Sequence, residues 1–167
     1  KQYYKPLSKT IALKYNPFTL IESRGFSQDI LKKSLSRWLY YKKLRKKINR
    51  VLIKDPIAIF SAEWLAERFG AQVVVLIRHP AAFVGSLKLK NLTHPFEHFL
   101  NQPLLMEDHL KGFRTEIEAF TKYSHNIIDQ ACLLWRIIYY VVNKYQNGHK
   151  DWLFIKHEDL SRKQIQE

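Results

Sequence analysis

The stretch Gln72-Val73-Val74-Val75-Leu76-Ile77-Arg78-His79-Pro80 decides the fold that this sequence predicts. Residues 72–77 are rich in β-branched side chains and are apolar on both faces of an extended chain. That pattern is typical of a strand buried in a parallel sheet. Pro80 suits the first turn of a helix. A strand that leads directly into a helix is the unit from which α/β proteins are built.

The residues upstream repeat this unit. Arg50-Val51-Leu52-Ile53-Lys54 predicts a short strand that ends at Asp55-Pro56. Ser61 with Glu63 predicts the start of a helix, and Gly70 predicts its end. The order strand, helix, strand, helix, with short connections, predicts a parallel sheet flanked by helices.

The residues downstream of Pro80 predict further helices and one further strand. We expect an irregular stretch over residues 91–106 and then a helix that carries Leu110 and Ile117 on one face. The remaining predicted elements are a long helix over about residues 126–147, a strand over 152–156, and a terminal helix that a Ser161–Gln164 capping box would start.

The first 50 residues lack the strand–helix pattern of the residues that follow. Residues 1–26 show no clear period and are punctuated by proline and glycine, which predicts extended or loop structure. Residues 27–48 predict a helix with Ser27 as N-cap and Asp29 in the first turn. We expect a single domain over residues 1–167, within which residues 27–50 form a basic helical segment.

Composition excludes several classes of protein. The 167 residues and 20.0 kDa suit one domain, and 46% hydrophobic residues are enough for a core. The lone cysteine, Cys132, excludes an intrachain disulfide framework and a Cys-rich zinc module. The most apolar stretch, residues 127–142, is broken by Asp129 and Arg136, so we expect no transmembrane segment.

The formal net charge of +13 favours an anionic partner. Two interpretations of the basic segment stay open: a solvated helix face, or a docking face for an acidic polymer or a membrane. The nine basic residues between positions 32 and 50 are Lys32, Lys33, Arg37, Lys42, Lys43, Arg45, Lys46, Lys47 and Arg50.

The predicted strands end in ionisable residues, and ligands of open parallel sheets bind outside those ends. Arg78 directly follows the most apolar strand, and its guanidinium offers planar donors that suit phosphate or sulfate. Ser86 lies eight residues further on and could reach the same anion. Alternatively, Arg78 pairs with a carboxylate such as Asp159, and Ser86 is packed within a helix.

Three ordered segments resemble the PAPS-dependent sulfotransferases, a family that transfers sulfate from 3'-phosphoadenosine 5'-phosphosulfate (PAPS). Residues 77–86, Ile-Arg-His-Pro-Ala-Ala-Phe-Val-Gly-Ser, resemble the segment with which this family binds the 3'-phosphate of PAPS. In that segment an arginine and a serine lie eight residues apart, as Arg78 and Ser86 do here. Ile53-Lys54-Asp55-Pro56 resembles the family's strand-end lysine segment. Residues 155–160, Ile-Lys-His-Glu-Asp-Leu, resemble a later strand that ends in Glu-Asp-Leu.

The resemblance covers about residues 50–165 and implies an α/β fold: a P-loop-NTPase-like parallel sheet flanked by helices, incomplete at the N-terminus. It implies transfer of a sulfuryl group from PAPS, as co-substrate, to a hydroxyl or amine, without a metal. Arg78 and Ser86 would bind the co-substrate. Catalysis would rest on positioning and on charge stabilisation.

Two departures from the family pattern matter. No segment matches the Ser-Gly-Thr-Thr loop that binds the 5'-phosphosulfate, so we expect the chain as given to be inactive alone. Pro56 stands where many members have the histidine that takes the acceptor's proton. Asp55 is then the candidate general base, or it caps the following turn. Lys54 is the candidate partner of the sulfuryl oxygens, or it pairs with a nearby carboxylate.

We expect a small-molecule or carbohydrate acceptor and no specific nucleic acid. The single cysteine and the lack of a predicted membrane anchor suggest a cytoplasmic, bacterial protein. His94 and His98 lie in the stretch where acceptor contacts would be expected. The alternative function is a basic binding module for nucleic acid or sulfated polysaccharide on an α/β scaffold. A P-loop nucleotide kinase is disfavoured, since the sequence holds no Walker lysine loop.

Overall fold

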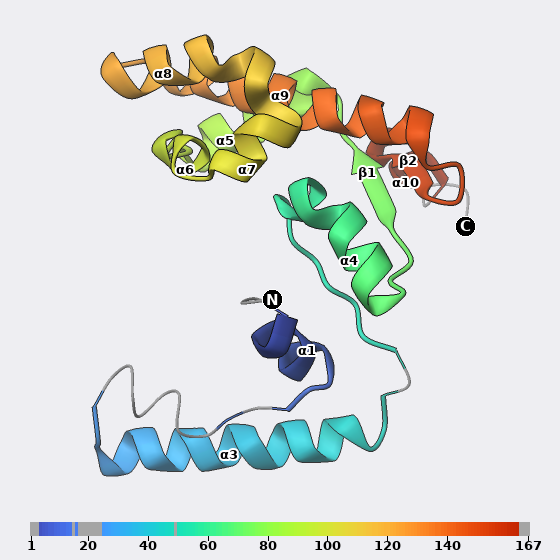
Figure 1. Ribbon diagram of the computed structural model, residues 1–167. Coiled ribbons are helices and arrows are strands. Elements are labelled where there is room, and N and C mark those ends of the chain that lie inside the picture. The colour runs from blue at the N-terminus through green and yellow to red at the C-terminus, as the bar shows by residue number, and fades with distance from the viewer. Residues whose placement is uncertain (1–3, 15, 17–24, 49, 164–167) are drawn as a thin grey trace. The chain divides into compact units, whose positions relative to one another are not determined.

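The structure, a computed structural model, describes residues 4–14, 16, 25–48 and 50–163. It divides the chain into two compact units, residues 1–54 and residues 55–167 (Figure 1). We call them unit 1 and unit 2 and describe each by itself.

Unit 1 begins with a helix where the sequence predicted extended or loop structure. Helix α1 spans Tyr4–Ile11, so that prediction is wrong for these residues. The helix ends in a Schellman motif: the Lys14 N–H donates to the Lys9 carbonyl over 2.8 Å, and the Leu13 N–H donates to the Thr10 carbonyl over 3.0 Å. Leu13 sits at the left-handed position of this motif with φ of 52°.

The second helix of unit 1, α3, spans Gln28–Arg45. The predicted N-cap is confirmed, since the Ser27 hydroxyl accepts a hydrogen bond from the Ile30 N–H over 3.2 Å. Asp29 lies in the first turn, where a carboxylate suits the helix dipole. Ser34 is the one buried residue of α3, so the helix leaves most of its surface exposed.

The predicted strand over residues 50–54 is wrong, because these residues form neither strand nor helix. Val51, Leu52 and Ile53 are exposed, Leu52 to 89%. β-Branched residues favour an extended backbone, but a strand also needs a neighbour to pair with its N–H and C=O groups. No such neighbour pairs with them in the described structure.

Unit 2 contains a two-stranded parallel sheet. Strand β1 spans Val74–Ile77 and pairs with β2, Leu153–Lys156, with Val74 opposite Leu153 and Ile77 opposite Lys156. Both strands are where the sequence predicted strands, each shortened at its start. The described residues therefore have an α/β fold in the broad sense, and a P-loop-like sheet is not shown.

The expectation that β1 is buried on both faces is wrong. Val75 is buried, whereas Val74 and Leu76 are 56% and 52% exposed, and Leu153 on β2 is 53% exposed. Successive side chains of a strand point to opposite faces. One face of the sheet therefore packs on the core, and the other leaves apolar side chains exposed.

The other elements of unit 2 are helices and helical turns, most of them close to the predicted positions. The terminal helix α10 starts at His157, not at Ser161 as predicted, and Gln164 lies outside the described residues. The predicted irregular stretch 91–106 contains two short helices, α6 and α7. The bounds are η1 Ala58–Ser61, α4 Ala62–Phe69, α5 Pro80–Leu89, α6 Glu97–Leu100, α7 Pro103–Leu105, η2 Met106–Leu110, η3 Lys111–Phe113, α8 Arg114–Lys122, α9 Ile127–Gly148 and α10 His157–Lys163.

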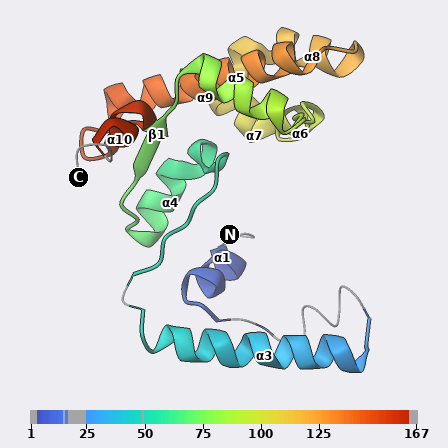
Figure 2. The same ribbon diagram turned by 180° about the vertical axis from the view of Figure 1, so that it is seen from behind.

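The core of unit 2 is built around α9, which lies alongside α5 in both views (Figure 1 and Figure 2). One face of α9 is buried, and Ile137 and Val141 are 0% exposed. Ile117 of α8 and Phe99 of α6 belong to the same cluster. Burial of side chains of this size stabilises a fold by about 1.5–3 kcal/mol each. The same helix also reaches the carboxyl end of β1.

Candidate functional site

The backbone of Arg78, directly after β1, is held by two aromatic side chains of α9. The Arg78 N–H donates to the Tyr139 hydroxyl over 2.5 Å, and the Trp135 indole N–H donates to the Arg78 carbonyl over 3.1 Å. The Trp135 and Tyr139 rings stack with centroids 4.5 Å apart. Both backbone groups of Arg78 are therefore satisfied, which fixes where its side chain starts.

The next residue is held in the same way by the other strand end. The His79 N–H donates to Glu158 Oε1 over 3.0 Å, and His79 Nδ1 accepts from the Ala81 N–H over 3.2 Å. His79 is thus the N-cap of α5, with Pro80 following it as the sequence predicted. Glu158, which follows β2, therefore links the end of that strand to the start of α5 by a hydrogen bond.

The guanidinium of Arg78 is left without a protein partner among the described residues. Its Nε atom is buried and makes no hydrogen bond, and the side chain forms no ion pair within the described part of the chain. The alternative that Arg78 pairs with Asp159 is therefore not what the structure shows. An unpartnered buried donor costs about 1–3 kcal/mol, and more when it is charged.

Ser86 lies in α5, six residues after the first helical residue, Pro80. Its Cα is therefore displaced by about 9 Å along the axis from that of Pro80. The side chains of Arg78 and Ser86 are both half-buried. Their convergence on one anion stays a prediction.

Tyr139, which contacts Arg78, and Glu158, which contacts His79, differ in charge. Burial raises the pKa of Tyr139, so its phenol keeps its proton and has one hydrogen left to donate. Hydrogen bonds from backbone N–H groups, His79 first, lower the pKa of Glu158, so its carboxylate stays charged. The sequence did not predict the contacts of Tyr139 and Trp135 with Arg78. Their helical spacing of four residues was the signal that they share a face.

Asp55 shows the second of its two predicted roles. Its Oδ1 accepts a hydrogen bond from the Ile57 N–H over 2.8 Å, which closes a turn before η1. Asp55 and Lys54 are both exposed and lie on either side of the boundary between the units. Catalytic roles for them stay a prediction.

His94 is half-buried beside aromatic rings. Its ring centroid lies 4.6 Å from that of Phe99 and 5.4 Å from that of Phe96, and its Nε2 has no hydrogen-bond partner. Burial, and then the neighbouring charge of His98, lower the pKa of His94, although Glu97 raises it. The neutral ring is therefore favoured, and acceptor contacts by either histidine stay a prediction.

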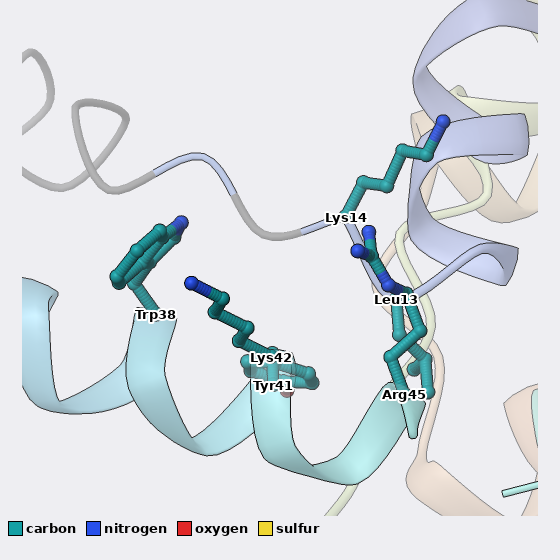
Figure 3. A pocket seen from close by; sticks show the side chains of 6 residues that line it. All are labelled: Leu13, Lys14, Trp38, Tyr41, Lys42 and Arg45. Atoms are coloured by element: carbon teal, nitrogen blue, oxygen red, sulfur yellow. The ribbon is translucent and has the colours of Figure 1, made fainter.

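Unit 1 contains a pocket of about 210 Å³ between the end of α1 and one face of α3. Figure 3 shows Trp38 and Lys42 on one side of it and Lys14 and Arg45 on the other. The Lys42 ammonium lies 4.8 Å from the centroid of the Trp38 ring, a cation–π contact. We call this the Trp38 pocket; it is lined by Leu13, Lys14, Trp38, Tyr41, Lys42 and Arg45.

The described residues hold no group of three or more His, Cys, Asp or Glu side chains that could bind a metal ion. None of their helices combines the length and the apolarity that crossing a membrane requires.

The chain was compared with known proteins in three ways. No family model, no curated protein and no solved structure matches it.

Proposed function

We propose that unit 2 binds the 3'-phosphate of PAPS in a sulfotransferase, with Arg78 as the main ligand and Ser86 as a second. The observation that carries the proposal is the half-buried Arg78 side chain, whose Nε lacks a partner although its backbone is fixed on both sides. A phosphate would satisfy that donor through charge-assisted hydrogen bonds. The resemblance of residues 77–86 to the family's phosphate segment supports the same ligand.

In such a reaction the acceptor's oxygen or nitrogen forms a bond to sulfur as the bond from sulfur to the 5'-phosphate oxygen breaks. The acceptor's proton passes to a base, for which Asp55 is the candidate that the sequence offers. Arg78 acts far from the sulfur, so its part is to hold and orient the nucleotide. Positioning of this kind supplies much of the rate in group transfer.

The test uses 3'-phosphoadenosine 5'-phosphate (PAP), the product, because binding does not need turnover. We expect PAP to raise the Tm of the 167-residue chain, and 5'-AMP, which lacks the 3'-phosphate, to raise it less. Arg78→Ala should abolish the difference between the two ligands. Ser86→Ala should weaken PAP binding by about ten-fold, since hydrogen bonds to charged groups contribute about 1.5–3 kcal/mol.

Two matched variants serve as controls. Arg68→Ala removes an exposed arginine of α4, and Ser36→Ala removes an exposed helical serine of α3. Neither should change PAP binding. If Arg78→Ala binds PAP as tightly as the unchanged chain, Arg78 is not the phosphate ligand and the proposal fails.

A further inference from the structure

The whole net charge of the chain lies in unit 1. Residues 1–54 carry 15 Lys and Arg against two Asp and Glu, a surplus of 13, while residues 55–167 carry 13 of each sign. Such asymmetry between two parts of one chain is typical of binding to nucleic acid or to an anionic surface. The net positive charge is therefore a property of unit 1, and a binding site for an anionic ligand is expected within that unit.

The Trp38 pocket combines the two kinds of side chain that single-stranded nucleic acid requires. Trp38 and Tyr41 offer planar rings, and Lys14, Lys42 and Arg45 offer cations at the same opening. Bases stack on aromatic rings, and cations neutralise the phosphates that flank them. Lys42 lies against the Trp38 ring, so a cation and an aromatic ring are neighbours in this pocket. In a nucleotide the phosphate and the base are neighbours in the same way, so the cation can bind the phosphate while the ring stacks on the base.

The backbone beside the pocket is strained. Leu13 has φ of 52°, which is a left-handed backbone conformation. This conformation is unfavourable in free energy for leucine, because its Cβ approaches the backbone, whereas glycine has no Cβ and adopts it without this cost. This conformation completes the Schellman motif and places Leu13 and Lys14 in the pocket wall. Strain of this kind concentrates at ligand sites, where the surrounding structure maintains it.

The size of the pocket favours a polymer over a free nucleotide. Its volume of about 210 Å³ is below the roughly 300 Å³ at which pockets begin to enclose a whole small ligand. It suits one base of a longer strand. Helix α3, with 18 residues, extends for about 27 Å and carries further cations along which the strand can continue.

We infer that the Trp38 pocket binds single-stranded nucleic acid without sequence preference, with one unpaired base against Trp38 and Tyr41 and the neighbouring phosphates on Lys14, Lys42 and Arg45. The inference concerns unit 1 alone and is independent of the function proposed for unit 2.

The experiment measures the fluorescence anisotropy of a short fluorescein-labelled oligothymidine titrated with the full 167-residue chain, between about 50 and 200 mM salt. Trp38→Leu should weaken binding by about ten-fold or more at every salt concentration, because stacking does not depend on counterions. Lys42→Gln should lower the slope of log Kd against log salt by about 0.7, the value for one phosphate contact on a single strand.

Controls separate the pocket from charge in general and from misfolding. Trp38→Phe keeps an aromatic ring and should retain most of the affinity. Lys32→Gln removes the same charge from α3 outside the pocket and should change Kd less than Lys42→Gln does. Circular dichroism of each variant checks that α3 still forms. Arg68→Ala, which removes an exposed arginine of α4 outside both proposed sites, should leave oligothymidine binding unchanged. PAP binding is measured separately on the same proteins, so that a failure of this inference is distinct from a failure of the function proposed above.

Three results would overturn the inference. The first is an unchanged oligothymidine affinity in a folded Trp38→Leu variant. The second is equal affinity for heparin or for anionic phosphatidylserine vesicles with the same dependence on Trp38, which would make the pocket a general polyanion site. The third is duplex DNA or free 5'-TMP binding as tightly as the single strand, since neither offers an unpaired base within a chain of phosphates.

Discussion

Single residues of unit 2 show how burial sets protonation. His94 is surrounded by phenylalanine rings, and its Nε2 is buried without a partner. Its lowered pKa follows mainly from that burial. A buried ring that resists protonation in the folded state links stability to pH, because the unfolded chain binds the proton more readily.

The sign of that link gives a prediction for His94. Because its pKa is lower in the folded state, the stabilisation is complete above the ordinary value of 6.5 and is lost as the pH falls through and below it. We expect His94→Phe, which cannot take up a proton, to lose less stability between neutral and mildly acidic pH than the unchanged chain. Urea unfolding at the two pH values measures this.

Substitution of the neighbouring His98 provides a control with a smaller expected effect. His98→Gln removes the second cause of the lowered pKa and should weaken the pH dependence by less than His94→Phe does. An identical pH dependence in all three proteins would show that His94 does not set it.

At the scale of elements, the sequence predicts best where a local signal fixes a helix end. Ser27, Pro80 and Gly70 each mark a helix end that the structure confirms, because capping groups act within a few residues. Strands depend on partners that the sequence does not name. Residues 50–54 have the composition of β1 but no pairing neighbour in the described structure, and they form no strand.

The start of α9 allows a direct test of one such cap. Asn126 Oδ1 accepts hydrogen bonds from the N–H groups of Ile128 and Asp129, both over 2.9 Å. Asn126→Ala should lower the free energy of unfolding of unit 2 by about 1 kcal/mol. Urea denaturation followed by circular dichroism measures it. The same substitution at exposed Asn143, inside α9, should cost nothing, since alanine favours helix interiors.

Asn126→Ser keeps a capping oxygen and should recover most of the loss. Equal destabilisation by alanine at positions 126 and 143 would mean that the cap contributes nothing measurable.

At the scale of the whole molecule, the overall composition does not show that the two units differ in charge and in apolar core. An overall charge of +13 and 46% hydrophobic residues describe neither unit, because the surplus charge lies in unit 1 and the described apolar core lies in unit 2. The sequence predicted Arg78 as a site residue from its place after a strand. It did not predict the Trp38 pocket, since that pocket depends on the end of α1, a helix that the sequence did not signal.

This contrast predicts two levels of local stability. Helix α3 has one buried residue, whereas α9 has seven, so α3 should open far more readily. Hydrogen exchange followed by mass spectrometry should show α3 amides exchanging early and those near Ile137 and Val141 exchanging late. Equal protection of both helices would contradict the division into units of unequal stability. Addition of oligothymidine should slow exchange in α3 and at the end of α1, where Leu13 and Lys14 line the Trp38 pocket, and should leave exchange in α9 unchanged.

The parallel pairing of β1 with β2 has a consequence for synthesis on the ribosome. Leu153 follows Ile77 by 76 residues, so β1 leaves the ribosome well before its partner exists. At about 5–20 residues per second the delay is roughly 4–15 s. Through that interval both edges of an apolar strand are open to other chains. A nascent chain arrested before position 153 should therefore recruit chaperones that a longer nascent chain no longer needs.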